Sequence, residues 1–270
     1  MYQVSIGSVI VSRLCIGGNP FSGFSHQSEE RSREMVAYYT PERIKETLRA
    51  AEAAGINTFI GRTDDHITGI LRDYWDEGGT IQRIAQITPD RDDPESWRKW
   101  LTAAAKLGAV GAYMHGGVVD SWHANRMFAH FEEALHRMRD EGFQAVGFAG
   151  HKPEAHAWIR DHLEVDFQMC SHYNPTDRSQ HAQHIGAGEK WDDADRAQML
   201  EVISTIEKPV INYKVFAGGN KPVIPAFELL AKVMRRNDAV CVGMFLKDDP
   251  QMIAKNVSLT ARYLTPPGVA

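Results

Sequence analysis

The order in which apolar and amphipathic segments follow one another most constrains the fold of this chain. After the first twelve residues, an apolar run, a polar loop and an amphipathic segment recur about eight times. The apolar runs, such as "AVGAYMH" and "AVCVGMF", are nearly continuous, which is typical of strands covered on both faces. About eight strand–helix units in 270 residues fit a closed ring better than an open sheet. We therefore predict an α/β fold, a (β/α)8 TIM barrel, with residues 1–270 forming a single domain.

The boundaries of the segments carry start and stop signals. The alternating residues 1–12, with Gly7 and Ser8 at the centre, predict an N-terminal β-hairpin. Thr40 predicts the N-cap of the first helix after it and Gly55 predicts its end. By the same reasoning we expect helices near residues 64–77, 94–107, 121–141, 153–163, 192–206, 222–236 and 249–263.

Two longer segments fall outside this rhythm. The charged segment 29–40 is interpreted either as a short helix or lid over the barrel mouth or as a solvated surface insertion. Residues 178–193, which include His181 and His184 and two glycines, are interpreted as a mobile loop after the sixth barrel strand that could close over a substrate.

Composition narrows the class of protein. A net charge of −5 and a pI near 6.2 argue against nucleic-acid binding, because recognition of phosphates needs a basic surface. No apolar run approaches the ~20 residues that span a bilayer, and the N-terminus lacks the features of a signal peptide. Cys15, Cys170 and Cys241 lie in apolar runs without metal-binding spacing, which predicts buried, reduced thiols in a cytoplasmic protein. The partner we expect is a small-molecule substrate.

Polar side chains collect where the predicted strands end. In a (β/α)8 barrel these ends meet at one mouth, where active sites lie. Three successive strands end in His115, His151 and His172. One histidine at such a place is commonly a hydrogen-bonded packing residue, and Asp64 could simply cap a helix, but the joint pattern predicts a functional mouth. The candidates for catalysis are His115, Lys214, Asp64 and His66, and those for substrate binding are Asn19, His26, Arg62, His151, His172, Tyr173 and Asn174.

Several segments resemble the aldo-keto reductase superfamily, whose members are (β/α)8 barrels with an N-terminal hairpin. "VSRLCIGGNPFSG" is similar to the opening of that family, and "AAEAAGINTFIGRTDDH" to its second strand. "AVGAYMHGG" resembles the fourth strand, which ends in the catalytic histidine of the family, and "FQMCSHYNP" resembles the sixth. The last two segments of the family also have counterparts, namely "INYKVFAGG" and "AVCVGMFLKDDPQMIAKN". In the family, the closing segment holds the cofactor phosphate. The resemblance covers nearly the whole chain and implies the same barrel.

The resemblance also implies a reductase machinery of Asp, Tyr, Lys and His, of which only His115 falls on a matching residue. Ile60 occupies the Asp position, and neither the tyrosine nor the lysine of the family is present. In that chemistry a phenol beside an ammonium protonates the carbonyl that receives hydride, so these departures argue against ordinary carbonyl reduction. If NAD(P) is bound, the expected binding residues are Tyr213, Gly218, Gly219, Lys247 and Asn256.

The polar mouth favours an enzyme that keeps the barrel and changes the chemistry. Histidine, aspartate and lysine together suit proton abstraction beside a carbonyl, as in an isomerase, epimerase or lyase of a small, sugar-like molecule. His115 would polarise the carbonyl or carry a proton, and Lys214 would stabilise an enolate or form an imine. Asp64 and His66 would act as the base or orient it.

Three alternatives stay open at this point. The first is an NAD(P)-dependent oxidoreductase in which His66 or Lys214 replaces the missing proton donor. The second is a metal-dependent lyase or hydrolase, with His115, His151 and His172 as the ligands of a divalent ion. The third is a binding protein without catalytic activity.

Overall fold

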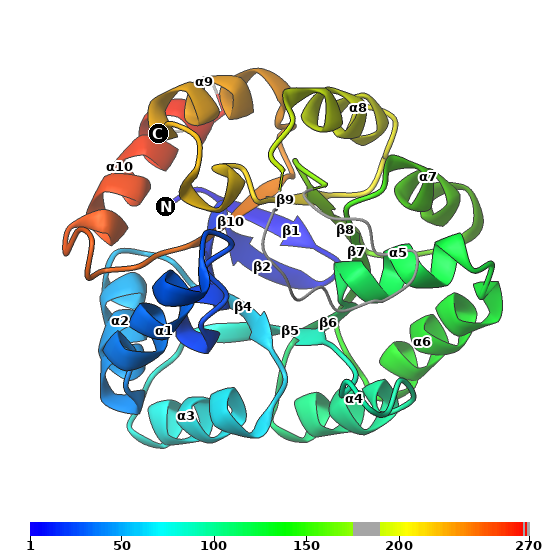
Figure 1. Ribbon diagram of the computed structural model, residues 1–270, viewed down its shortest axis with the longest axis horizontal. Coiled ribbons are helices and arrows are strands. Elements are labelled where there is room, and N and C mark those ends of the chain that lie inside the picture. The colour runs from blue at the N-terminus through cyan, green and yellow to red at the C-terminus, as the bar shows by residue number, and fades with distance from the viewer. Residues whose placement is uncertain (175–189, 267, 269–270) are drawn as a thin grey trace.

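The computed structural model describes residues 1–174, 190–266 and 268, and in this part of the chain eight parallel strands close into a barrel (Figure 1). Around the ring the order is β10-β3-β4-β5-β6-β7-β8-β9, so the last strand pairs with the first. The predicted (β/α)8 TIM barrel with an N-terminal hairpin is confirmed. The hairpin strands are β1 (Gln3–Ile6) and β2 (Val9–Ser12), and the barrel strands are β3 (Leu14–Gly17), β4 (Thr58–Arg62), β5 (Gln82–Ile87), β6 (Gly111–Met114), β7 (Ala145–Gly150), β8 (Phe167–Ser171), β9 (Val210–Tyr213) and β10 (Ala239–Gly243).

A ring of helices covers the outer face of the barrel (Figure 1). Two of them begin where the sequence signals predict, because Thr40 accepts a hydrogen bond from the backbone of Arg43 and Asp64 accepts one from that of Ile67. The helices of this ring are α2 (Pro41–Ala53), α3 (Asp65–Asp76), α4 (Trp97–Lys106), α5 (Gly116–Ala124), α6 (Phe128–Asp140), α7 (Pro153–His162), α8 (Asp193–Ile203), α9 (Val223–Val233) and α10 (Met252–Leu264).

The hairpin closes the barrel at the amino-terminal ends of the strands. The backbone N–H of Ser8, in the hairpin turn, donates to the carbonyl of Gln144, which directly precedes β7. Ile6 and Val11 are completely buried and pack in one cluster with barrel residues such as Phe167. The hairpin therefore fills the end of the barrel where the strands begin.

The predicted single helix over 121–141 is wrong. Two helices, α5 and α6, cover this stretch, and α5 begins at Gly116, directly after His115. The chain turns between them at Arg126, whose φ is 56°. Gly116 and Gly117 are poor helix formers, so the sequence did not predict that α5 begins there. Tertiary packing overrides their low helix propensity.

The charged segment 29–40 forms helix α1 (Glu29–Tyr38) at the mouth, beside the short 3-10 helix η1 (Asn19–Ser22). Met35 and Tyr39 are buried, and the Tyr39 hydroxyl donates to the carbonyl of Met244, 2.6 Å away. The structure thus agrees with the helical interpretation of this segment rather than with a solvated insertion.

Other expectations concern the cysteines, the membrane and the loop after β8. Cys15, Cys170 and Cys241 are buried and form no disulfide, as expected. Within the described ranges, every helix is too short or too polar to cross a membrane. The predicted loop over 178–193 lies outside the described residues as far as residue 189, together with His181 and His184.

We expect the stability of the barrel to depend on the packing of the buried face of the hairpin. Replacing Ile6, which is 0% exposed, with alanine removes packed methyl groups and leaves a cavity, so Ile6→Ala should lower the free energy of unfolding by about 2–5 kcal/mol. Ile10 lies on the other face of the same hairpin and is 48% exposed, so Ile10→Ala should change it by less than about 0.5 kcal/mol. Urea denaturation measures both, and equal losses would contradict the placement of the hairpin.

Candidate active site

A cavity of about 520 Å³ opens at the carboxyl ends of the barrel strands. Its inner part includes Ile60, Met169, Tyr113 and Cys241. Burial raises the pKa of the Cys241 thiol to about 12 and the pKa of the Tyr113 phenol well above its ordinary value, so this part of the cavity is uncharged. The residues predicted from the sequence that line the cavity are Asn19, His26, His115, His151, Tyr213, Lys214, Gly218, Gly219 and Asn256.

Three side chains form a hydrogen-bonded chain, which we call the relay, that ends in this cavity. The Asp120 carboxylate lies 2.8 Å from Nδ1 of His151, and Nε2 of the same ring lies 3.2 Å from the Tyr213 hydroxyl. Asp120 and His151 are each only 3% exposed, whereas Tyr213 lines the cavity. Because an ionised carboxylate can only accept hydrogen bonds, Nδ1 carries the proton and Nε2 is an acceptor that faces the Tyr213 hydroxyl. The Gly150 carbonyl is a second acceptor for that hydroxyl, also at 3.2 Å.

Asp120 also holds helix α5 against the end of β7. Its carboxylate accepts hydrogen bonds from the backbone N–H groups of His151, at 3.0 Å, and Lys152, at 3.2 Å. Sequence reasoning missed this residue, because it lies in a segment that was not expected to be helical. The sequence feature that could have identified Asp120 is a single acidic residue within the apolar stretch "VVDSW".

Two glycines provide the space that the relay occupies. A Cβ atom on Gly116 would lie 2.8 Å from the Tyr213 hydroxyl and 2.9 Å from Cε1 of His151, which is closer than real Cβ contacts allow. A Cβ atom on Gly150 would lie 2.8 Å from Nε2 of His156 and 3.3 Å from the Asp120 carboxylate. The glycine that follows the strand-ending His115 is therefore needed for side-chain packing at this point.

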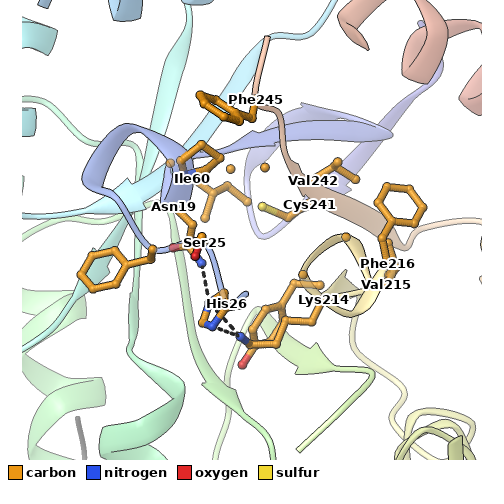
Figure 2. Close-up of a pocket in the computed structure, with 18 of the residues that line it drawn as sticks. Asn19, Ser25, His26, Ile60, Lys214, Val215, Phe216, Cys241, Val242 and Phe245 are labelled. Atoms are coloured by element: carbon orange, nitrogen blue, oxygen red, sulfur yellow. Dashed lines mark hydrogen bonds between the residues drawn. The ribbon is translucent and has the colours of Figure 1, made fainter. Parts of the chain in front are cut away.

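A second polar cluster faces the cavity from the first and seventh barrel strands (Figure 2). Nζ of Lys214 lies 2.9 Å from Nε2 of His26 and 3.3 Å from Nδ1 of the same ring. The side-chain nitrogen of Asn19 lies 3.1 Å from Nε2 of His26. Trp191 adds an indole ring whose centroid is 5.4 Å from Nζ of Lys214. An amine, an imidazole and an amide thus meet beside the cavity.

The backbone at Lys214 is unusual in a way that affects the site. Successive residues of a strand point to opposite faces, yet Tyr213, at the end of β9, and Lys214 both line the cavity. Lys214 has a φ of 55°, in the left-handed region that few residues other than glycine adopt. This turn brings both side chains to the same cavity.

The mouth is covered on one side by α1 and the segment after β10. Arg31 of α1 lines the cavity and pairs with Asp248, and its guanidinium lies 4.5 Å from the centre of the Phe245 ring. Lys247 pairs with Glu34 at 2.7 Å and does not line the cavity. Among the residues predicted to bind NAD(P), Lys247 is thus paired with a carboxylate, whereas Tyr213, Gly218, Gly219 and Asn256 line the cavity.

Three residues predicted for the mouth do not line the cavity. Asp64 caps α3 and also lies 3.4 Å from Nε of Arg62. The Arg62 guanidinium lies 5.2 Å from the centre of the Phe24 ring. His66 is exposed in the first turn of α3. The structure therefore places Asp64 in the helix-capping role that was its simpler interpretation.

The residues after β8 are held in the protein interior. His172 is 1% exposed, and its Nε2 lies 3.0 Å from the side-chain oxygen of Asn212. The Tyr173 hydroxyl accepts from Arg196 at 2.8 Å, and neither Tyr173 nor Asn174 lines the cavity. Among the described residues no group of three His, Cys, Asp or Glu could hold a metal ion, so the structure does not gather His115, His151 and His172 into a metal site.

Comparison with known proteins shows a likeness of fold. No family model matches the chain, and no curated protein matches its sequence. Its structure is similar to aldo-keto reductase AKR11C1 from Bacillus halodurans in the holo form, with a TM-score of 0.58, 14% identity and coverage of 96% of this chain and 90% of that one. It is also similar to dihydropteroate synthase from Xanthomonas albilineans, with a TM-score of 0.55, 9% identity and coverage of 98% and 99%.

A third likeness is to orotidine 5′-monophosphate decarboxylase from Methanocaldococcus jannaschii, with a TM-score of 0.51, 14% identity and coverage of 82% of this chain and 93% of that one. At such identities the likeness concerns the barrel alone. The relationship to aldo-keto reductases expected from the sequence therefore holds at the level of the TIM-barrel fold. Because one barrel serves proteins with different names and chemistries, the activity depends on the side chains at its mouth.

The tight packing at Gly116 leads to a stability prediction. Gly116→Ala should force the Tyr213 and His151 side chains apart and lower the free energy of unfolding by about 1–3 kcal/mol. Gly69→Ala is the matched control, because Gly69 is also helical and has no atom within 4 Å of an added Cβ. That variant should gain up to about 1 kcal/mol from helix propensity. Urea denaturation separates the two, and a stabilised Gly116→Ala variant would contradict the packing described here.

Burial of His172 predicts a pH dependence of stability. Desolvation by burial lowers the pKa of His172 to about 4, against about 6.5 in an unfolded chain. The unfolded state therefore binds the proton first, so stability is fully present above pH ~6.5 and is lost as the pH falls towards 4. His172→Gln should reduce the loss of unfolding free energy between pH ~6.5 and 4 by at most roughly 3 kcal/mol. The exposed control His66→Gln should keep the wild-type slope, and identical slopes in all three proteins would refute the prediction.

Proposed function

We propose that this protein is an enzyme that moves a proton beside the carbonyl group of a small-molecule substrate, as an isomerase, epimerase or lyase does. The observation that carries the proposal is the relay of Asp120, His151 and Tyr213, which opens into the cavity that Lys214 and His26 also line. An acid–base group and a cationic group that face one cavity are what enolate chemistry requires.

Tyr213 is the group that exchanges protons with the substrate. Its hydroxyl proton can pass to Nε2 of His151, 3.2 Å away, which leaves a phenolate that accepts a proton from carbon. The Asp120 carboxylate fixes the ring orientation and stabilises the imidazolium that forms. This is the arrangement of an acid–histidine pair behind a hydroxyl, with tyrosine as the hydroxyl. The reaction is completed when the proton returns to the same carbon, on either face, or to the adjacent carbon of the substrate.

Lys214 supplies a positive charge next to the negative charge that develops on the substrate. Its amine lies beside His26, and Asn19 adds an amide N–H on the same side of the cavity. Hydrogen-bond donors and cations fixed in advance stabilise a charge that grows in the transition state. His115 lines the same cavity and can polarise the carbonyl or carry a proton.

The cavity also supports a small substrate. Its volume of about 520 Å³ falls within the range of ~300–1,000 Å³ that is usual for small-molecule sites. The inner part, with Ile60 and Met169, is uncharged, and electrostatic interactions are stronger in apolar surroundings than in water.

Exchange of carbon-bound hydrogen with solvent tests the proposal. The protein is incubated in D₂O with a panel of small hydroxycarbonyl compounds, namely dihydroxyacetone, glycolaldehyde and hydroxypyruvate, and loss of the proton beside the carbonyl is followed by NMR. We expect catalysed exchange with at least one compound. Tyr213→Phe should reduce the rate by about 10²–10⁴-fold, because it removes the acid–base group.

Tyr263→Phe serves as the control, since Tyr263 lies on α10 outside the cavity and should keep the wild-type rate. The proposal is refuted if no compound exchanges faster than without protein, or if Tyr213→Phe retains the full rate. Quenching of tryptophan fluorescence by micromolar NADH or NADPH would favour hydride transfer instead.

A further inference from the structure

We propose that Lys214 forms a covalent imine with the substrate, which makes the substrate an aldehyde or ketone that reacts through its carbonyl carbon. This inference rests on the proposed proton-transfer function and adds a covalent step to it. It is carried by the position of the amine: Lys214 lines the cavity next to Tyr213, and its Nζ lies 2.9 Å from an imidazole nitrogen of His26.

The backbone is shaped to deliver this amine to the cavity. Lys214 adopts a φ of 55°, and His26, which meets it from the loop after β3, has a φ of 58°. Left-handed backbone at residues other than glycine costs free energy and persists where the surrounding structure enforces it, commonly at functional sites. Both partners of the Lys214–His26 contact are held in this way.

The surroundings of the amine suit a reaction in which water is released. His26 is placed to carry the protons, and Asn19, 3.1 Å from its Nε2, fixes the ring. The Trp191 indole lies next to both side chains, with its ring centre 5.4 Å from Nζ and 6.2 Å from the His26 ring centre. A lysine amine on the wall of a partly apolar cavity, next to a base, is the usual setting of imine formation.

The step balances without any oxidant or reductant. His26 takes one proton from the Lys214 ammonium, and the neutral nitrogen attacks the carbonyl carbon to form a C–N bond. A second proton then passes from the nitrogen to the former carbonyl oxygen, which gives a carbinolamine. His26 returns the first proton to that hydroxyl, the C–O bond breaks, and the oxygen leaves as water. In sum, a protonated lysine and a carbonyl give an iminium ion and one water molecule. Tyr213, with its own proton on His151, can then remove a proton from the adjacent carbon to give an enamine.

Reductive trapping tests the covalent step. Wild-type protein is mixed with dihydroxyacetone, glycolaldehyde or hydroxypyruvate and treated with sodium borohydride, and the intact mass and its proteolytic peptides are measured. We expect one adduct that has the mass of the probe less one oxygen and that maps to Lys214. Lys214→Arg keeps the charge but cannot form an imine, so it should lose both the adduct and the solvent exchange. His26→Asn should slow trapping by about 10²-fold or more.

Lys208→Arg is the matched control, because Lys208 is exposed and contacts Glu164, away from the cavity. It should keep both adduct and exchange, and circular dichroism shows whether each variant is folded. If exchanging probes give no adduct, or if adducts persist in Lys214→Arg, the imine is overturned while the proton-transfer function stands. An adduct at Lys214 without any exchange keeps the imine and overturns the proton-transfer function. Absence of both overturns both.

Discussion

The pairing of β3 with β10 is the contact on which the rest of the structure depends. These strands lie at opposite ends of the chain. Their parallel register places Cys15 opposite Cys241 and Gly17 opposite Gly243. The backbone N–H of Val240 also donates to the carbonyl of Arg13. Once this pair forms, the sheet has no open edge. All eight strand ends then face one opening, which brings residues far apart in sequence to one cavity (Figure 1).

The relay depends on that closure and on one local feature. Asp120, His151 and Tyr213 come from α5, the end of β7 and the end of β9, and only a curved sheet brings the last two together across β8. Helix α5 can lie close enough to join them because Gly116 has no side chain. The second cluster, Lys214 with His26, reaches the same cavity from β9 and from the loop after β3. The cavity thus combines an acid–base group on one wall with a cationic group on another.

Much of this could be predicted from the sequence, because strand ends and helix caps are local signals. The barrel, the hairpin and a polar mouth with His115, His151, Tyr213 and Lys214 follow from the alternation of segments alone. The position of α5 does not, because a Gly-Gly start is unfavourable in isolation and is selected by packing. Asp120 was missed for that reason.

The roles of His172 and Asp64 could not be decided from the sequence, because the order of the strands does not give the direction of a side chain. His172 ends a strand like its neighbours, but its side chain is buried beside Asn212, which follows from the direction of the side chain. Asp64 likewise stands at a strand end but turns to the backbone of α3. A sequence can show that a residue lies at the mouth, whereas the contacts of its side chain depend on neighbours that are distant in the chain.

The tautomer of His151 tests the relay most directly. Protein labelled with ¹⁵N-histidine is studied by two-bond ¹H–¹⁵N correlation NMR at neutral pH, with the His151 ring assigned from the signal that is missing in His151→Gln. The relay predicts a neutral ring with its proton on Nδ1, facing Asp120, and an unprotonated Nε2 that faces the Tyr213 hydroxyl. A proton on Nε2, whether alone or together with one on Nδ1, would contradict it.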